Sequence, residues 1–177
     1  MDFSQDHFAL FGLPRRYALD EAQLGRLYHE IQARVHPDKH VNLSAAEQRL
    51  AMQWTTRVNE AYQVLRQPLS RAKYLLSLAG VDVDRGREMS GEFLTQQMEL
   101  RETVAEARAA GDVARLEVLH GRLKRELAQE YAKLAAALEA DLGSNSQAAP
   151  AVKLLRQLMF QEKLLHEIDD ALAAAEA

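Results

Sequence analysis

Apolar residues recur along most of the chain at spacings of three and four, the pattern of helices that bury one face. The first long stripe is formed by Leu24, Leu27, Tyr28, Ile31 and Val35. A second stripe consists of Leu50, Trp54, Val58, Ala61, Tyr62 and Leu65. A shorter helix carrying Phe3, Phe8 and Leu10 is expected before them. The first 79 residues therefore predict an antiparallel helical hairpin with short flanking helices.

Polar residues and prolines mark the ends of these helices. Asp20, with Gln23 three positions later, predicts the start of the first long helix, and Pro37 stops it because a proline disfavours helical geometry in the residue before it. Ser44 and Glu47 form the capping box of the second long helix. Pro68 ends that helix, and a short helix from about residue 69 to 79 closes at Gly80. Residues 36–43 are then a loop.

The stretch between Gly80 and Gly91 holds three glycines and little periodicity, which predicts a domain boundary. Helices are expected at about 92–110, 113–142 and 151–175, and their short connections predict antiparallel neighbours. The sequence therefore predicts an all-α protein with an N-terminal domain at 1–79, a linker at 80–91 and a three-helix bundle at 92–177.

Composition narrows the classes of function. The 177 residues include only eight glycines and four prolines, which fits a mostly helical chain, and no cysteine, which excludes disulfides and thiolate metal sites. Lysine and arginine number 22 against 26 aspartates and glutamates, a formal charge of −4 that argues against nucleic acid as a partner. The acidic N-terminus and short apolar runs predict no signal peptide and no membrane span. We expect a cytoplasmic protein without cofactor or metal.

The loop after the first long helix carries the tripeptide His36-Pro37-Asp38. Pro37 stiffens the turn, so Asp38 is expected to be an exposed carboxylate suited to an arginine of a partner. One alternative is an ordinary helix-stopping turn. Another is a metal site from His36, Asp38 and His40, with or without His29, but the loop offers these three residues no fourth strong ligand.

The tripeptide, its spacing from Tyr28, Lys39 after it and the "AYxVL" end of the next helix together resemble a J-domain. The resemblance implies that residues 1–75 stimulate ATP hydrolysis by a DnaK-class chaperone and need no catalytic group. It also implies that the chaperone-binding residues are His36, Pro37, Asp38, Lys39, Arg26 and Arg34. Most J-domains have a lysine- and arginine-rich outer face on the helix before this loop. In this chain that face has fewer basic residues, and Glu30 interrupts it.

Two stretches, "LRxPLxRAxYLLSLxG" from Leu65 and "FLxxQxELRE" from Phe93, extend the similarity over essentially the whole chain. They resemble the HscB (Jac-type) co-chaperone family of iron–sulfur cluster biogenesis. The resemblance implies two protein partners, an HscA-type chaperone and an IscU-type cluster scaffold. Since the chain has no cysteine, any cluster would stay on the partner.

Helical periodicity independently singles out part of the bundle. At about 100° per residue, Phe93, Leu100, Val104 and Ala107 form the expected core face of the helix at 92–110, whereas Leu94 and Met98 lie off it. In the last helix the expected core face is Leu154, Leu158, Leu165, Ile168 and Leu172, and Phe160 points away from it.

These off-face apolar residues have glutamates beside them, which would suit a partner with a basic rim. The family resemblance implies scaffold binding by Leu94, Met98, Glu99, Glu102, Glu106 and Phe160. Thr95 stands where the family usually has an apolar residue. The alternative is that Leu94 and Met98 pack inside the protein and that the glutamates only aid solubility.

Two other functions remain open at this point. A general J-domain co-chaperone for unfolded clients is one, although the chain has neither a glycine/phenylalanine-rich linker nor cysteine-rich zinc repeats. An enzyme is the other, but the sequence contains no recognisable nucleophile–base pair or glycine-rich phosphate loop. We therefore expect a co-chaperone and no enzymatic activity.

Overall fold

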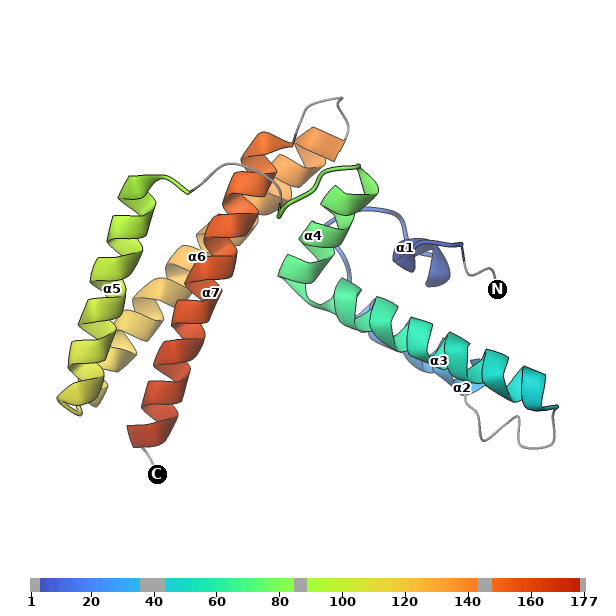
Figure 1. Cartoon of the computed structure of the whole chain (residues 1–177), viewed down its shortest axis with the longest axis horizontal. Helices are drawn as coiled ribbons and strands as arrows, with labels where there is room; N and C mark the ends of the chain where they lie inside the picture. The colour runs from blue at the N-terminus through green and yellow to red at the C-terminus, as the bar shows by residue number, and fades with distance from the viewer. Residues whose placement is uncertain (1–3, 36–43, 85–88, 143–147, 176–177) are drawn as a thin grey trace. The chain divides into compact units, whose positions relative to one another are not determined.

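The computed structural model describes residues 4–35, 44–84, 89–142 and 148–175. These residues form seven helices and no strand, which confirms the expected all-α class. In chain order (Figure 1) the helices are α1 (His7–Leu10), α2 (Glu21–Val35), α3 (Ala45–Arg66), α4 (Pro68–Leu78), α5 (Gly91–Ala109), α6 (Val113–Leu142) and α7 (Ala149–Ala175). None of the described helices is long and apolar enough to cross a membrane.

The chain divides into two compact units, residues 1–78 and residues 79–177. In the first unit α2 and α3 pack side by side as the hairpin expected from the sequence. The start of α2 is fixed by Asp20, whose Oδ1 accepts hydrogen bonds from the backbone N–H groups of Ala22 (2.9 Å) and Gln23 (3.1 Å). The capping box of α3 is also confirmed: Glu47 N–H donates to Ser44 Oγ, and Ser44 N–H donates to Glu47 Oε2.

The core of the first unit contains most of the two expected stripes. Its buried residues include Phe8, Leu24, Ile31, Val35, Trp54, Val58, Ala61, Leu65, Leu75 and Leu76. The expectation for Leu50 was wrong, because this side chain is 46% exposed while Ala51 is buried. The buried stripe of α3 runs through Ala51, Trp54 and Val58 and so passes beside Leu50.

The second unit is built on α6 and α7, which pack along most of their lengths, with α5 beside them (Figure 1). The expected face of α7 was only partly right. Its buried residues are Ala151, Leu155, Leu158, Leu164, Ile168 and Ala171, whereas Leu154, Leu165 and Leu172 are half-buried. Two members of the true stripe are alanines, whose small side chains permit close helix packing but add little to a pattern that is read from large apolar residues.

The start of the second unit is tied to α7. Gly80 has a positive φ of 76°, a left-handed conformation that glycine adopts without steric cost. Beyond it Val83 is buried, and Nε of Arg156 donates a 2.8 Å hydrogen bond to the Val83 carbonyl. Val83, near the start of the second unit, is therefore anchored on the bundle.

Candidate functional site

The sequence places the first candidate site in the loop between α2 and α3. The loop residues His36, Pro37, Asp38, Lys39 and His40 lie outside the described residues. What the structure does describe is the two stems of the loop. Among the described residues no group of three or more metal-ligating side chains is close enough to hold an ion.

Both stems of this loop are fixed by hydrogen bonds. On the α2 side, the Thr55 hydroxyl on α3 shares its proton between the carbonyl of Val35 (3.1 Å), the last residue of α2, and that of Ala51 (2.9 Å) on its own helix. On the α3 side, the capping box of Ser44 and Glu47 sets the first turn. The hairpin therefore presents the loop from two restrained ends.

Tyr28 strengthens the same hairpin from its middle. Its ring stacks on Tyr62 of α3, with 4.1 Å between the ring centroids. Its hydroxyl donates to Asn59 Oδ1 (3.0 Å) and accepts a hydrogen bond from Gln32 Nε2 (2.8 Å). Tyr28, whose spacing from the loop was part of the sequence pattern, therefore joins α2 to α3.

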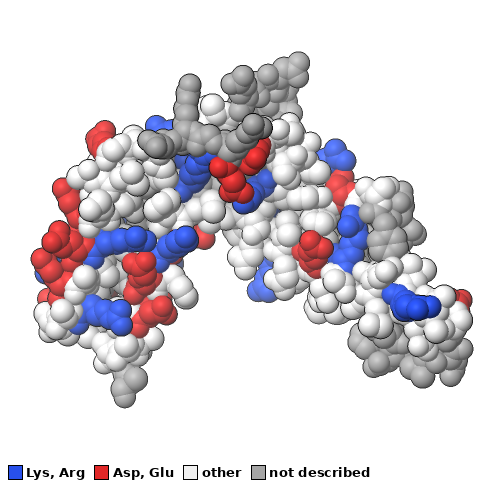
Figure 2. Space-filling view, viewed as in Figure 1, with Lys and Arg blue, Asp and Glu red and all other residues white. Residues whose placement is uncertain are grey.

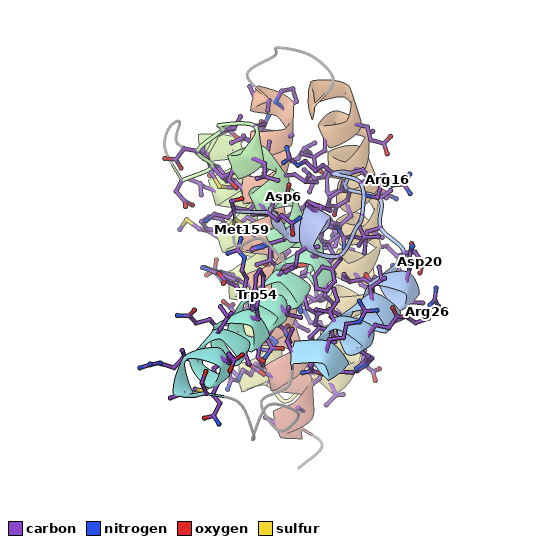
Figure 3. All side chains as sticks on the ribbon, turned by 90° about the vertical axis from the view of Figure 1, so that its right-hand side faces the viewer. Asp6, Arg16, Asp20, Arg26, Trp54 and Met159 are labelled. Carbon is purple, nitrogen blue, oxygen red and sulfur yellow. The ribbon has the colours of Figure 1, made fainter. Side chains whose placement is uncertain are left out.

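The two basic candidates on α2 are exposed. Arg26 projects outward from the helix in Figure 3, and Arg34 lies in its last turn. Glu30, also exposed, stands between them along the helix. The outer face of α2 is therefore accessible and only moderately basic.

The second candidate site is on α5 and α7. Leu94 is 38% exposed, Met98 72% and Phe160 39%, which confirms that these apolar side chains lie off the bundle core. The rings of Phe93 and Phe160 meet edge to face, with centroids 6.5 Å apart, so the two helices are joined here by an aromatic pair. We call Leu94, Met98 and Phe160 the apolar patch.

The glutamates predicted beside this patch differ in their surroundings. Glu102 is exposed one helical turn after Met98. Glu99 lines a cleft that faces α6, and Glu106 forms a 3.4 Å ion pair with Arg115 of α6. Figure 2 shows acidic side chains along the edge that α5 occupies in Figure 1. Thr95 is exposed on the same helix.

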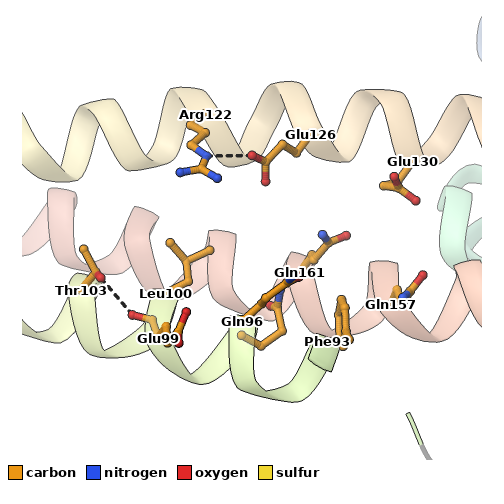
Figure 4. Close-up of a pocket in the computed structure, with 11 residues that line it drawn as sticks. Phe93, Gln96, Glu99, Leu100, Thr103, Arg122, Glu126, Glu130, Gln157 and Gln161 are labelled. Carbon is orange, nitrogen blue, oxygen red and sulfur yellow. Dashed lines mark hydrogen bonds and ion pairs between the residues drawn. The ribbon is translucent and has the colours of Figure 1, made fainter. Parts of the chain in front are cut away.

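The cleft itself was not anticipated from the sequence. It has a volume of about 600 Å³ and lies between α5, α6 and α7. Its lining residues, shown in Figure 4, are Phe93, Gln96, Gln97, Glu99, Leu100, Thr103, Arg122, Glu126, Glu130, Gln157 and Gln161. Gln157 and Gln161 lie one turn apart on α7, but the sequence alone does not indicate that they face a cleft, since α5 and α6 complete it.

Shifted pKa values occur mainly around α1. Burial lowers the pKa of His7, although Glu60 partly offsets the effect, and burial raises the pKa of Tyr74. Burial would also raise the pKa of Asp6, but hydrogen bonds from the Ala9 and Phe8 N–H groups and from Arg15 outweigh it and hold this pKa below its usual value. None of these groups belongs to either candidate site.

Comparison with known proteins gives consistent matches. Residues 89–169 match the family model described as the HSCB C-terminal oligomerisation domain. The chain is 54% identical over 178 residues to the co-chaperone protein HscB homolog of Azoarcus sp. (strain BH72), covering 99% of this chain and 98% of that protein. The homolog of Ralstonia nicotianae is 47% identical over 171 residues, covering 96% of this chain and 95% of that protein.

Solved structures agree. Chaperone HscB from Vibrio cholerae superposes with a TM-score of 0.84 at 33% identity, covering 94% of this chain and 96% of that one. Human co-chaperone protein HscB gives a TM-score of 0.86 at 29% identity, covering 96% of this chain and 83% of that one.

Proposed function

The chain belongs to the HscB family of co-chaperones, and on that premise we propose that it acts in iron–sulfur cluster biogenesis with two protein partners. Its first unit stimulates the ATPase of an HscA-type, DnaK-class chaperone. Its second unit binds an IscU-type scaffold and delivers it to that chaperone. The observation that carries the proposal is the exposed apolar patch on α5 and α7.

The chaperone contact is assigned to His36, Pro37, Asp38 and Lys39, with Arg26 and Arg34 on α2. Its support is the resemblance of the loop to a J-domain and the restrained stems on either side. The action is allosteric: Asp38 pairs with a charged group of the chaperone and favours its hydrolysing state. No nucleophile or metal of this chain takes part in hydrolysis.

The scaffold contact is assigned to Leu94, Met98 and Phe160, with Glu99, Glu102 and Glu106 around them. Large apolar side chains that stay exposed in a folded unit often mark a protein interface. Charges at the edge of such a patch guide the choice of partner more than they add affinity. The expected partner surface is therefore apolar at its centre and basic at its margin.

The chaperone assignment is tested with Asp38→Ala. This variant should fold normally, by circular dichroism, and lose stimulation of the chaperone's steady-state ATPase, because the carboxylate that pairs with the chaperone is gone. Glu139→Ala, at an exposed position of α6, is the control and should stimulate like the wild type. Full stimulation by Asp38→Ala would refute the assignment.

The scaffold assignment is tested with Met98→Ala combined with Phe160→Ala. Central apolar contacts of an interface cost about 2 kcal/mol or more when truncated, so scaffold affinity measured by calorimetry should fall at least about tenfold. Val118→Ala is the control: it removes an apolar side chain of α6 that is about as exposed (70%) as Met98 (72%), and it should leave affinity unchanged. An unaltered Kd in the double variant would rule out this docking surface.

A further inference from the structure

The cleft between α5, α6 and α7 is polar where a helical bundle ordinarily packs apolar side chains. Four glutamines line it: Gln96, Gln97, Gln157 and Gln161. Figure 4 shows that Glu126, Glu130 and Arg122 reach into it from α6. A space of about 600 Å³ with such a lining can take a polar side chain together with water.

The charges of the lining leave one carboxylate without a cation. Glu126 accepts a 2.8 Å hydrogen bond from Arg122 Nε, and Glu130 is paired with Lys133 at 2.6 Å. Glu99 has no ion-pair partner among the residues that the structure describes. The cleft therefore carries a net negative charge from α5.

Gln161 adds an unused acceptor. Its amide oxygen Oε1 is buried and accepts no hydrogen bond from any described residue. A buried carbonyl without a donor costs free energy that an incoming N–H group would recover. Glu99 on α5 and Gln161 on α7 thus each contribute an acceptor to the cleft, from two different helices.

The cleft adjoins the apolar patch at Phe93. Phe93 belongs to its lining and also contacts Phe160 of the patch, edge to face. Glu99 follows Met98 directly in the chain. A partner seated on Leu94, Met98 and Phe160 would consequently have residues at the mouth of the cleft.

We propose that the cleft receives an arginine side chain of the docked scaffold partner, an inference that rests on the proposed function. A guanidinium is always charged and carries five donors in a planar fork, so it can serve Glu99 and Gln161 together and lie against the Phe93 ring. A lysine ammonium is a compact charge without this planar geometry. The patch supplies apolar contact, and the cleft supplies the directional polar contact.

The first experiment uses N-acetyl-arginine amide as a probe of the free, full-length protein. Titration followed by NMR should give saturable shifts in the side-chain amide signals of Gln97, Gln157 and Gln161. N-acetyl-lysine amide should give much weaker shifts. The absence of saturable shifts with the arginine probe, or equal shifts with both probes, would overturn the proposal.

The second experiment measures scaffold binding by the full chain. Gln161→Leu and Glu99→Gln should each weaken the scaffold about tenfold, the effect expected for losing a hydrogen bond to a charged group. Gln129→Leu and Glu139→Gln are matched controls at exposed positions of α6 and should bind like the wild type. Wild-type affinity in both cleft variants would overturn the proposal even if Met98→Ala with Phe160→Ala abolishes binding.

The two experiments separate this inference from the proposed function. If the double patch variant binds the scaffold normally while the arginine probe still saturates the cleft, the docking surface fails and so does the assignment of the arginine to the scaffold. If the patch variant loses binding and the probe does not bind, only the cleft fails.

Discussion

At the residue scale, His7 shows how burial and a charge interact. Its ring stacks on Tyr74 with 4.3 Å between centroids, its backbone N–H donates to the Tyr74 hydroxyl, and Nδ1 is buried without a hydrogen-bond partner among the described residues. Glu60 and Asp6 favour the protonated ring and Arg57 disfavours it, but burial dominates and lowers the pKa. In the folded chain His7 is accordingly neutral near pH 7.

This lowered pKa predicts a pH-dependent stability of the first unit. The His7 ring binds a proton more tightly in the unfolded chain than in the folded one. The folded first unit therefore has its full stability above the unfolded pKa of about 6.5, and its free energy of unfolding decreases as the pH falls below that value. Urea unfolding can be followed by the fluorescence of Trp54, the single tryptophan, which is buried. The urea concentration at the midpoint should decrease as the pH is lowered from 7.5 to 5.5. The fall should be smaller in His7→Phe but unchanged in His29→Phe, whose ring is exposed. Equal falls in all three proteins would contradict the role of His7.

At the element scale, the end of α2 depends on a bond from α3. Thr55→Val keeps the shape of the side chain and removes the donor to Val35, so we expect about 1 kcal/mol of destabilisation by urea unfolding and weaker stimulation of the chaperone's ATPase. Thr56→Val is the matched control, because among the described residues the Thr56 hydroxyl donates to its own helix alone, at Met52 (3.1 Å). Identical behaviour of the two variants would show that the bond to α2 does not restrain the loop.

The elements differ in how far the sequence predicts them. Local signals, such as Asp20 before α2 and Ser44 with Glu47 before α3, predict helix starts because each cap is made within a few residues. The buried face of α7 and the exposure of Leu50 depend on which neighbour each helix packs against, and residue spacing does not contain that information. Exposure of Leu94, Met98 and Phe160 could be predicted, whereas the cleft could not, since it arises from three helices together.

At the scale of the whole molecule, each unit has a core of its own. Leu65 is fully buried in the first unit and Leu134 in the second. Leu65→Ala should destabilise the first unit by about 2–5 kcal/mol and lower the urea midpoint seen by Trp54 fluorescence. Leu134→Ala should leave the fluorescence midpoint of the first unit unchanged. It should lower the urea midpoint of the circular dichroism signal that comes from the helices of the second unit. A common shift of both signals in each variant would mean that the two units unfold as one.

The hydrogen bond from Arg156 to Val83 shortens the tether between the units. Because Val83 is held on the bundle, the connecting segment runs only from the end of α4 at Leu78 to Val83. A fully extended chain spans at most about 3.6 Å per residue, so this segment is short. A tether this short gives a cargo on one unit a high effective concentration for a partner on the other, without any added contact. Under the proposed function, transfer of the scaffold to the chaperone would then be nearly intramolecular, and a longer segment would lower the effective concentration.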